Sequence, residues 1–284
     1  MTSARAAAHA QALFLDAAPG QRFGLFHPPA GPSCRGAILY VHPFGDEMNK
    51  SRRMAALQAR ALAAAGFGVL QLDLYGCGDS SGELRDARWT RWKQDLAVAS
   101  AWLRTQLGQP VHLWGLRLGA LLALDYAHDA QEPVAGLLLW QPVLSGPIFL
   151  TQFLRLRVAG DMLAGAAAAD AGTGATALRA ALAAGETLEI GGYEMAPALA
   201  AAIDALDADA WLPACPVAWF ELVAQDGRPL PARSARLQAD WQTRGVKLNV
   251  HVVTGKPFWA TQEISESTAL VEATVAAQCE AVHA

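Results

Sequence analysis

The chain has 284 residues, of which 53% are hydrophobic and only 17% are charged, and its formal net charge is −4. This composition excludes a disordered chain, and the length fits one large α/β domain or a smaller core that carries an insertion. No cluster of Lys and Arg follows one face, so the sequence predicts no nucleic-acid-binding surface.

Cysteine usage and the apolar runs predict the compartment. The four cysteines are far apart and form no Cys-x-x-Cys pair; they are Cys34, Cys77, Cys215 and Cys279. This pattern argues against zinc and against a disulfide framework, and it fits a reducing compartment. Residues 1–10 lack the basic region and long apolar core of a signal peptide, and no other apolar run is long enough to cross a membrane. We expect a soluble cytoplasmic protein with no metal, no cofactor and no membrane span.

The predicted elements begin with a hairpin, residues 12–16 and 22–26, around a turn at Pro19-Gly20. Short apolar runs then predict buried strands at residues 36–41, 67–73, 111–114, 136–140, 217–223 and 247–253. Segments of helical character alternate with them, at residues 51–65, 89–107, 118–127, 231–244 and 266–283. This alternation predicts an α/β fold with a mostly parallel central sheet, right-handed crossovers and flanking helices.

Residues 146–210 differ from the rest of the chain. They are rich in alanine, contain a Gly/Ala/Thr stretch at residues 160–174, and show no strand pattern. We interpret this cap segment (residues 146–210) as a helical insertion with a mobile middle, lying over the carboxyl edge of a core made of residues 1–145 and 211–284. Ordinary packing helices are the alternative interpretation.

The sequence Gly115-Leu-Arg117-Leu-Gly119 follows a strand and precedes a helix. A nucleophile elbow has this layout: a strand, then the pattern Gly-x-X-x-Gly, then a helix, with small residues that permit a sharp turn. The middle position of an elbow is expected to be Ser, Cys or Asp, but here it is Arg117. The alternative is a plain strand-to-helix turn with a solvated arginine.

Two other loops fall at the carboxyl ends of predicted parallel strands, where ligands bind in such sheets. The first begins at His42 and continues through Phe44 to Glu47, and a loop in this place normally donates a backbone N–H to an oxyanion hole. The second contains Asp226, which stands where a triad acid follows its strand. A surface Asp-Gly turn is the alternative interpretation of Asp226.

Together with the elbow, His42-Pro-Phe-Gly and the stretch Leu72-Asp-Leu-Tyr-Gly-Cys-Gly-Asp-Ser-Ser-Gly82 resemble the α/β-hydrolase superfamily. The longer strings His42-Pro-Phe-Gly-Asp-Glu-Met-Asn-Lys-Ser-Arg-Arg-Met and Gln152-Phe-Leu-Arg-Leu-Arg resemble the second of two hydrolase-like families associated with the exosortase A system. The resemblance extends from about Phe23 to Ile264. It implies an α/β-hydrolase fold and a role beside PEP-CTERM protein sorting and exopolysaccharide genes.

Serine acyl transfer needs a nucleophile, a base within hydrogen-bond reach and an acid that orients the base. The base is expected shortly after Gly255, but the chain continues Lys-Pro-Phe-Trp-Ala and reaches no histidine before His283. His251 lies inside the last strand, which favours a structural role. Arg117 stays protonated and is neither nucleophile nor base. We therefore expect a degenerate triad and no ordinary serine hydrolysis.

Arg117 has a different chemical use at this place. A guanidinium at a helix N-terminus favours a carboxylate or phosphate, while Asp226, Asp46 or Glu47 would compete for it as internal partners. The side chains expected to line the binding site are Phe44, Gly45, Glu47, Leu118, Trp140, Phe258 and Trp259.

Three interpretations follow. In the first, the protein binds an anionic small molecule or peptide end beneath the cap segment, and an open pocket at Arg117 favours it. In the second, a hydrolase uses a rearranged site in which His42 serves Cys77, Ser80, Ser145 or an activated water; a His–Ser or His–Cys hydrogen bond favours it. In the third, the chain is a scaffold for a protein of the exosortase or exopolysaccharide system, and a filled cleft with an exposed apolar cap face favours it.

Overall fold

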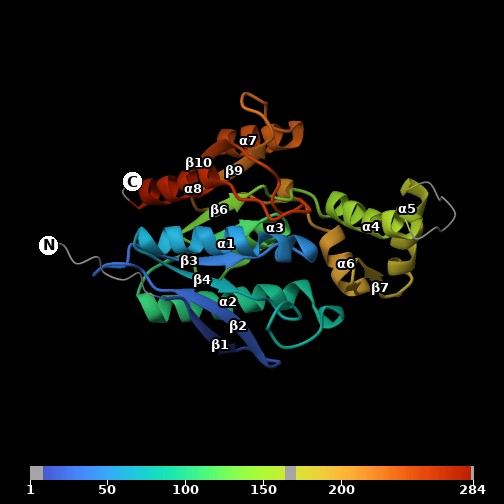
Figure 1. Ribbon diagram of the computed structural model, residues 1–284, viewed down its shortest axis with the longest axis horizontal. Coiled ribbons are helices and arrows are strands. Elements are labelled where there is room, and N and C mark those ends of the chain that lie inside the picture. Colours follow the sequence, from blue (N-terminus) through green and yellow to red (C-terminus); the bar gives the residue numbers. More distant parts are fainter. Residues whose placement is uncertain (1–8, 164–170, 283–284) are drawn as a thin grey trace.

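An eight-stranded sheet organises the chain, in the strand order β1-β2-β4-β3-β5-β6-β9-β10 (Figure 1). The computed structural model describes residues 9–163 and 171–282. The strands are β1 Gln11–Asp16, β2 Gln21–His27, β3 Gly36–Val41, β4 Phe67–Leu72, β5 Val111–Leu116, β6 Gly136–Trp140, β9 Val217–Val223 and β10 Leu248–Thr254. β1 and β2 pair antiparallel with each other and β2 pairs antiparallel with β4, whereas all other pairs are parallel. The predicted mostly parallel sheet is therefore confirmed.

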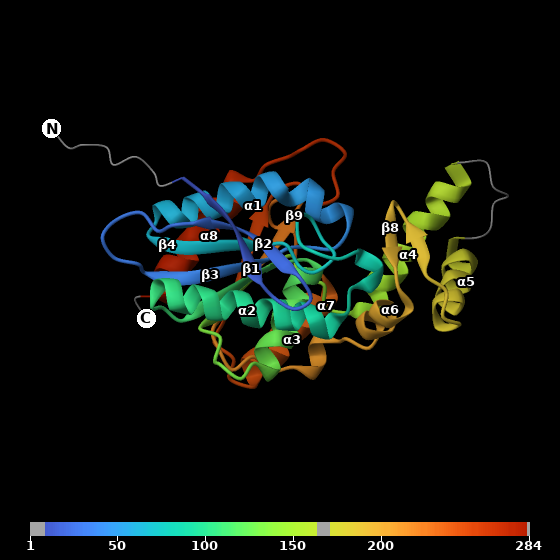
Figure 2. The same ribbon diagram turned by 90° about the horizontal axis from the view of Figure 1, so that it is seen from below.

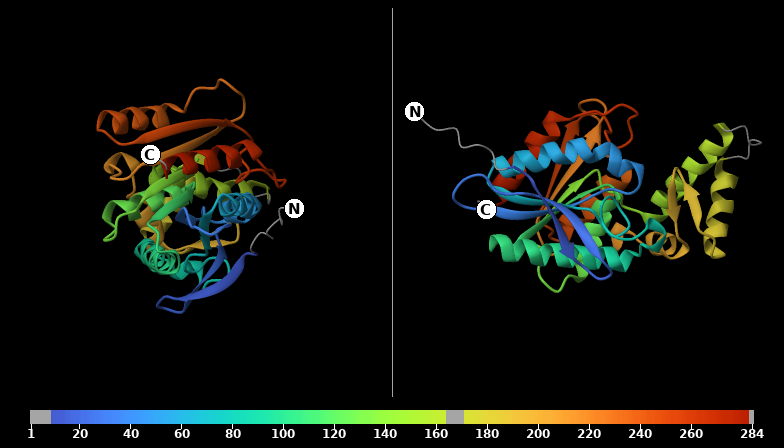
Figure 3. Two further views of the ribbon diagram at one scale, coloured as in Figure 1. Left: turned by 90° about the vertical axis from the view of Figure 1, so that its left-hand side faces the viewer. Right: turned by 60° about the horizontal axis from the view of Figure 1, so that its bottom comes forward.

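Helices cover both faces of this sheet (Figure 3). They are α1 Asp46–Ala64, α2 Trp89–Leu107, α3 Leu118–Asp129, α7 Ala232–Thr243 and α8 Thr268–Ala281, with short 3-10 turns at Leu84–Asp86 and Ala208–Ala210. Alternate residues of β3 enter different cores: Ile38 packs with α1 and α8, and Leu39 packs with α2 and α3. Burial of both faces explains why the strands read as continuous apolar runs.

Helix α1 begins at Asp46, five residues before the predicted start at residue 51. Gly45 precedes it with φ of 60°, a left-handed conformation that suits glycine. Asp46 and Glu47 therefore lie in the first turn of a helix, where negative charge is favoured by the helix dipole, and not in a loop.

The cap segment contains a hairpin that the sequence analysis did not predict. Besides α4 Gly146–Leu163, α5 Ala171–Ala183 and α6 Pro197–Asp204, it forms β7 Leu188–Ile190 and β8 Tyr193–Met195, which pair antiparallel. Each strand has three residues, too few for an alternating pattern, but Gly191 and Gly192 both have positive φ, as two-residue hairpin loops require. Figure 2 shows the segment projecting from one end of the sheet. Residues 164–170, inside the Gly/Ala/Thr stretch, lie outside the described residues, so the expected mobile middle of the cap segment stays a prediction.

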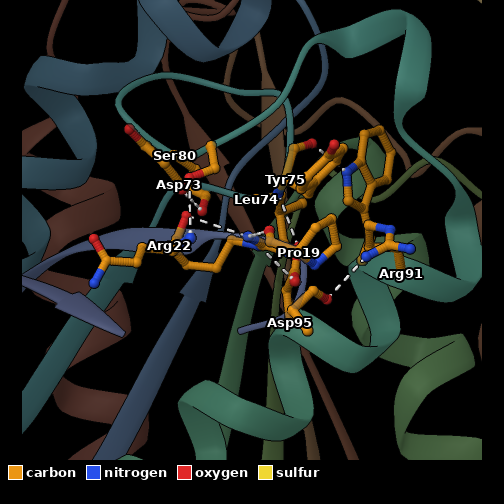
Figure 4. A network of polar contacts seen from close by, with 12 residues as sticks. Pro19, Arg22, Asp73, Leu74, Tyr75, Ser80, Arg91 and Asp95 are labelled. Atoms are coloured by element: carbon orange, nitrogen blue, oxygen red, sulfur yellow. Dashed lines mark hydrogen bonds and ion pairs between the residues drawn. The ribbon is translucent and has the colours of Figure 1, made fainter. Parts of the chain in front are cut away.

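A buried ion pair between Arg22 and Asp95 connects the amino-terminal hairpin, β1–β2, to helix α2 (Figure 4). Nε of Arg22 donates to Oδ1 of Asp95 over 2.7 Å, and the two side chains are only 1% and 2% exposed. Oδ2 of Asp95 accepts the backbone N–H of Tyr75 at 2.8 Å, and the Arg22 guanidinium lies 4.7 Å from the centre of the Tyr75 ring. One carboxylate thus joins β2, α2 and the loop after β4.

No helix in the described ranges is long and apolar enough to cross a bilayer.

Replacing Asp95 with Asn will lower the free energy of unfolding by about 3 kcal/mol, because it leaves a buried guanidinium without its counter-charge. Urea denaturation followed by circular dichroism measures the change. The matched control is Asp240→Asn, which removes an exposed ion pair with Arg244 and will change stability by less than about 1 kcal/mol. Equal stabilities for the two variants would contradict this account.

Candidate functional site

The backbone of Arg117 forms a sharp turn between β5 and α3. Its φ of 55° and ψ of −117° are unusual for a residue with a side chain. A Cβ on Gly115 would lie 2.4 Å from Cα of Ala120, and one on Gly119 would lie 2.3 Å from the carbonyl oxygen of Val41. The two glycines let helix α3 fold tightly against the strand ends, and the turn has the strained geometry of an elbow.

The Arg117 side chain pairs with Glu47, one of the three internal carboxylates considered from the sequence. Nε of Arg117 donates to Oε1 of Glu47 at 3.2 Å, and the guanidinium carbon lies 5.5 Å from the ring centre of Trp259. Trp259 follows the last strand, where the sequence analysis expected a base. Burial raises the pKa of Glu47, while the neighbouring Arg117 charge opposes that rise.

A cavity of about 410 Å³ lies over the elbow, between the core and the cap segment. The core supplies Phe44, Asp46, Glu47, Lys50, Arg117, Trp259 and Ala260. The cap segment supplies Phe149, Gln152, Phe153, Leu156, Ile190, Gly191 and Tyr193. The volume lies within the usual range for small-molecule sites.

Arg117 keeps hydrogen-bonding capacity in this cavity. Only its Nε has an acceptor; among the described residues neither Nη group has a hydrogen-bond partner, and neither is fully buried. A guanidinium presents its donors as a planar fork that matches the oxygens of an anion. The internal ion pair and an anion site are therefore compatible, since they use different nitrogens.

Asp226 does not reach Arg117. It is exposed in the loop after β9, where its Oδ1 accepts the N–H of Gly227 at 2.9 Å, which is the surface-turn interpretation of this residue. The buried acid of this region is Glu221 on β9, only 2% exposed, which accepts the hydroxyl of Ser234 at 2.6 Å. Burial raises the pKa of Glu221, and Arg117 acts against that rise. A carboxyl inside an apolar strand was the signal that could have identified Glu221 from the sequence.

His42 is buried below the site, and both of its ring nitrogens are engaged. Nε2 accepts the backbone N–H of Leu74 at 3.2 Å, so Nδ1 carries the proton and donates it to the carbonyl of Pro43 at 2.7 Å. Burial lowers the pKa of His42, which favours the neutral ring. His42 also borders a smaller cavity of about 210 Å³ together with Arg52 and Asp73.

The candidate nucleophiles are not paired with His42. The hydroxyl of Ser80 donates to the carbonyl of Asp73 at 2.5 Å, and burial raises the pKa of the Cys77 thiol to about 12. Ser145 is buried at the start of α4, where its backbone bridges to Asp207. Within the described ranges no hydrogen bond joins a serine or cysteine to a histidine, and no group of His, Cys, Asp or Glu is arranged to hold a metal ion.

Several side chains expected at the site lie elsewhere. Trp140 is fully buried behind the sheet, where its Nε1 donates to Thr274 at 2.9 Å. Phe258 packs beside Trp140, with ring centres 6.0 Å apart, and does not line the cavity. Leu118 is buried under the elbow. Phe44, Glu47 and Trp259 line the cavity as expected, and a Cβ on Gly45 would lie 3.6 Å from Phe153 of the cap segment.

His251 lies within β10, with its ring stacked on that of Phe220 at 4.6 Å between centres. This placement inside the sheet agrees with the structural role that its position in the strand suggested. His283 lies outside the described residues.

Residues 32–183, more than half of the chain, match the model of the serine aminopeptidase S33 family (Hydrolase_4). The chain belongs to this family. Human protein ABHD12B is 28% identical to this S33 member over 158 residues, which cover 47% of the chain and 42% of the human protein. The chain thus matches less than half of the length of this curated relative.

Solved structures agree on the fold of this S33 member. Ferulic acid-bound Est1E from Butyrivibrio proteoclasticus superposes with a TM-score of 0.66 at 13% identity, covering 94% of this chain and 96% of that chain. Proline iminopeptidase from Mycobacterium smegmatis superposes with a TM-score of 0.60 at 14% identity, covering 96% and 99%. The fold is the α/β-hydrolase fold, as the sequence predicted.

Replacing Gly119 with Ala will destabilise the protein by about 3 kcal/mol or more, because the new methyl group meets the Val41 and His42 carbonyl oxygens at 2.3 and 2.4 Å. Gly160→Ala in α4 is the matched control, since nothing lies within 4 Å of its Cβ position, and it will be neutral or slightly stabilising. The urea concentration at which half of the protein is unfolded is measured for both variants. A Gly119→Ala midpoint equal to that of the parent protein would contradict the predicted clash.

Proposed function

We propose that this S33-family protein binds a molecule with an anionic group beneath the cap segment and does not hydrolyse it. The observation that carries the proposal is the cavity at Arg117, where neither Nη group of the guanidinium has a hydrogen-bond partner among the described residues. A degenerate triad is part of the proposal: Arg117 takes the nucleophile position and Trp259 lies where the base is expected.

The elbow supports anion binding as well as the side chain does. Helix α3 starts directly after Arg117, whose side chain makes no capping hydrogen bond to the first N–H groups of the helix. Free N–H groups and the helix dipole favour negative charge at such an end. The guanidinium of Arg117 adds a full positive charge at the same end of the helix.

The contacts of His42 disfavour a rearranged hydrolase. A general base needs a nitrogen lone pair within reach of the proton that it removes. The only lone pair of neutral His42 accepts the N–H of Leu74, and the Cys77 thiol remains protonated at neutral pH. A scaffold without a ligand is disfavoured because the cleft is open rather than filled.

The biological setting is proposed from the sequence strings that start at His42 and Gln152, which resemble an exosortase A-associated family. In that setting the ligand is an anionic small molecule or a peptide end, and the protein partners belong to PEP-CTERM sorting or exopolysaccharide production.

Purified protein will show no turnover above background on short and medium acyl esters and thioesters, because no serine or cysteine among the described residues is hydrogen-bonded to a histidine. The same panel is run with Arg117→Ala and His42→Ala, and a spectrophotometric assay of the released alcohol or thiol measures the rates. Turnover that His42→Ala abolishes would establish a hydrolase and end the binding proposal.

Arg117→Gln will weaken the binding of small carboxylates at least tenfold, since a charge-assisted hydrogen bond contributes about 1.5–3 kcal/mol. Isothermal titration calorimetry with acetate and benzoate measures the affinities. Arg52→Gln is the matched control, because Arg52 is half exposed on α1 and does not line this cavity. Equal losses in the two variants would mean that the anions bind by general charge attraction and not at Arg117.

A further inference from the structure

The wall of the Arg117 cavity is mostly apolar and aromatic. Phe44 of the core meets Phe153 of α4 edge to face, with ring centres 5.0 Å apart, and Phe153 stacks on Phe149 at 6.2 Å. Leu156 and Ile190 extend this wall along the cap segment. Such a surface binds the apolar body of a ligand rather than a second polar group.

The other charged groups of the cavity already have partners. Nζ of Lys50 pairs with Asp46 at 2.8 Å, and Glu47 pairs with Arg117. The hydroxyl of Tyr193 accepts a hydrogen bond from Asn49 at 2.8 Å. Lys50 and Tyr193 keep protons of their own, and Gln152 adds an amide. The planar fork of donors that matches a carboxylate, however, is supplied by the guanidinium of Arg117.

The charge balance of the cavity favours a monoanion. Two positive side chains, Lys50 and Arg117, face two negative ones, Asp46 and Glu47. One ligand carboxylate would accept hydrogen bonds from the unused Nη groups of the guanidinium. The second negative charge of a phosphate would be repelled by the carboxylates of Asp46 and Glu47, and no further cation of the cavity would balance it. Like charges close together disfavour ionisation of both.

The chemistry of the wall also disfavours a peptide body. Each peptide unit brings an N–H and a C=O that must find partners when they leave water, and leaving them unpaired costs about 1–3 kcal/mol each. The phenylalanine, leucine and isoleucine side chains of this wall supply none, and Gln152 and Tyr193 supply fewer polar groups than a peptide body would bring. An alkyl chain needs none.

Resting on the proposed function, we infer that the ligand is a medium-chain aliphatic monocarboxylate, with its carboxylate on Arg117 and its chain between Phe44 and the cap segment. The cavity of about 410 Å³ sets the length. At the roughly 30 Å³ that a water molecule occupies in the liquid, the cavity holds about fourteen non-hydrogen atoms. With two of them as carboxylate oxygens, that number corresponds to a carboxylate of about twelve carbons.

Calorimetric titration of the full chain with straight-chain carboxylates from acetate to tetradecanoate tests the inference. Affinity will rise up to about fourfold for each added methylene, the value for complete burial, and will level off at about twelve carbons. Arg117→Gln will weaken decanoate binding at least tenfold and leave decan-1-ol binding unchanged. Decyl phosphate will bind more weakly than decanoate.

Leu156→Ser and Ile148→Ser form a matched pair, because both are exposed apolar residues of α4 and only Leu156 lines the cavity. Leu156→Ser will weaken decanoate binding about threefold to tenfold while acetate binding stays constant, and Ile148→Ser will change neither.

The two proposals fail in different ways. Arg117-dependent binding of acetate or benzoate with no gain from chain length, or tighter binding of decyl phosphate, would overturn the chain inference and leave the anion site standing. Absence of Arg117-dependent binding for every anion tested would overturn the proposed function itself.

Discussion

The turn at Arg117 is the constraint on which the site depends. Helix α3 can lie against the ends of β3 and β5 only because Gly115 and Gly119 lack side chains, and that close packing forces residue 117 to a positive φ. The backbone therefore holds whatever side chain stands at position 117 at the carboxyl edge of the sheet. The position is set by the scaffold, and the chemistry is set separately by the side chain placed there.

Changing that side chain changes what the turn can do. A hydroxyl there needs a neighbouring base, whereas a guanidinium is already charged and needs only an anion. Glu47 and Trp259 hold Arg117 from two sides, one by an ion pair and one by its ring face, so the orientation of the guanidinium does not depend on a ligand. Preorganisation of this kind reduces the entropy lost on binding. It agrees with our proposal that the protein binds without cleaving.

The sequence predicted the sheet well because each buried strand carries its own signal, a short apolar run bounded by turn residues. It also located the elbow, whose glycine spacing is local. The sequence did not identify the partner of Arg117, because Asp46, Glu47 and Asp226 are all far from Arg117 along the chain and each is a possible acceptor. Only the packing of α1 against the sheet brings Oε1 of Glu47 within 3.2 Å of Nε of Arg117. The prediction that Trp140 lines the site was wrong for a related reason. The sequence of a strand end does not tell whether an aromatic side chain faces a pocket or, as Trp140 does, packs toward Thr274 on α8.

The two parts of the cavity wall have different physical tasks. The core supplies the ion pair and the strained turn, which are fixed by backbone packing and tolerate little change. The cap segment supplies side chains on α4 and on the β7–β8 hairpin. The α4 side chains meet the core through the aromatic contacts of Phe44, and Tyr193 of the hairpin meets it through the hydrogen bond from Asn49. A substitution on the cap segment therefore alters the shape of the apolar wall without disturbing Arg117. In the binding that we propose, the core determines the charge of the ligand, and the cap segment determines the size and shape of its body.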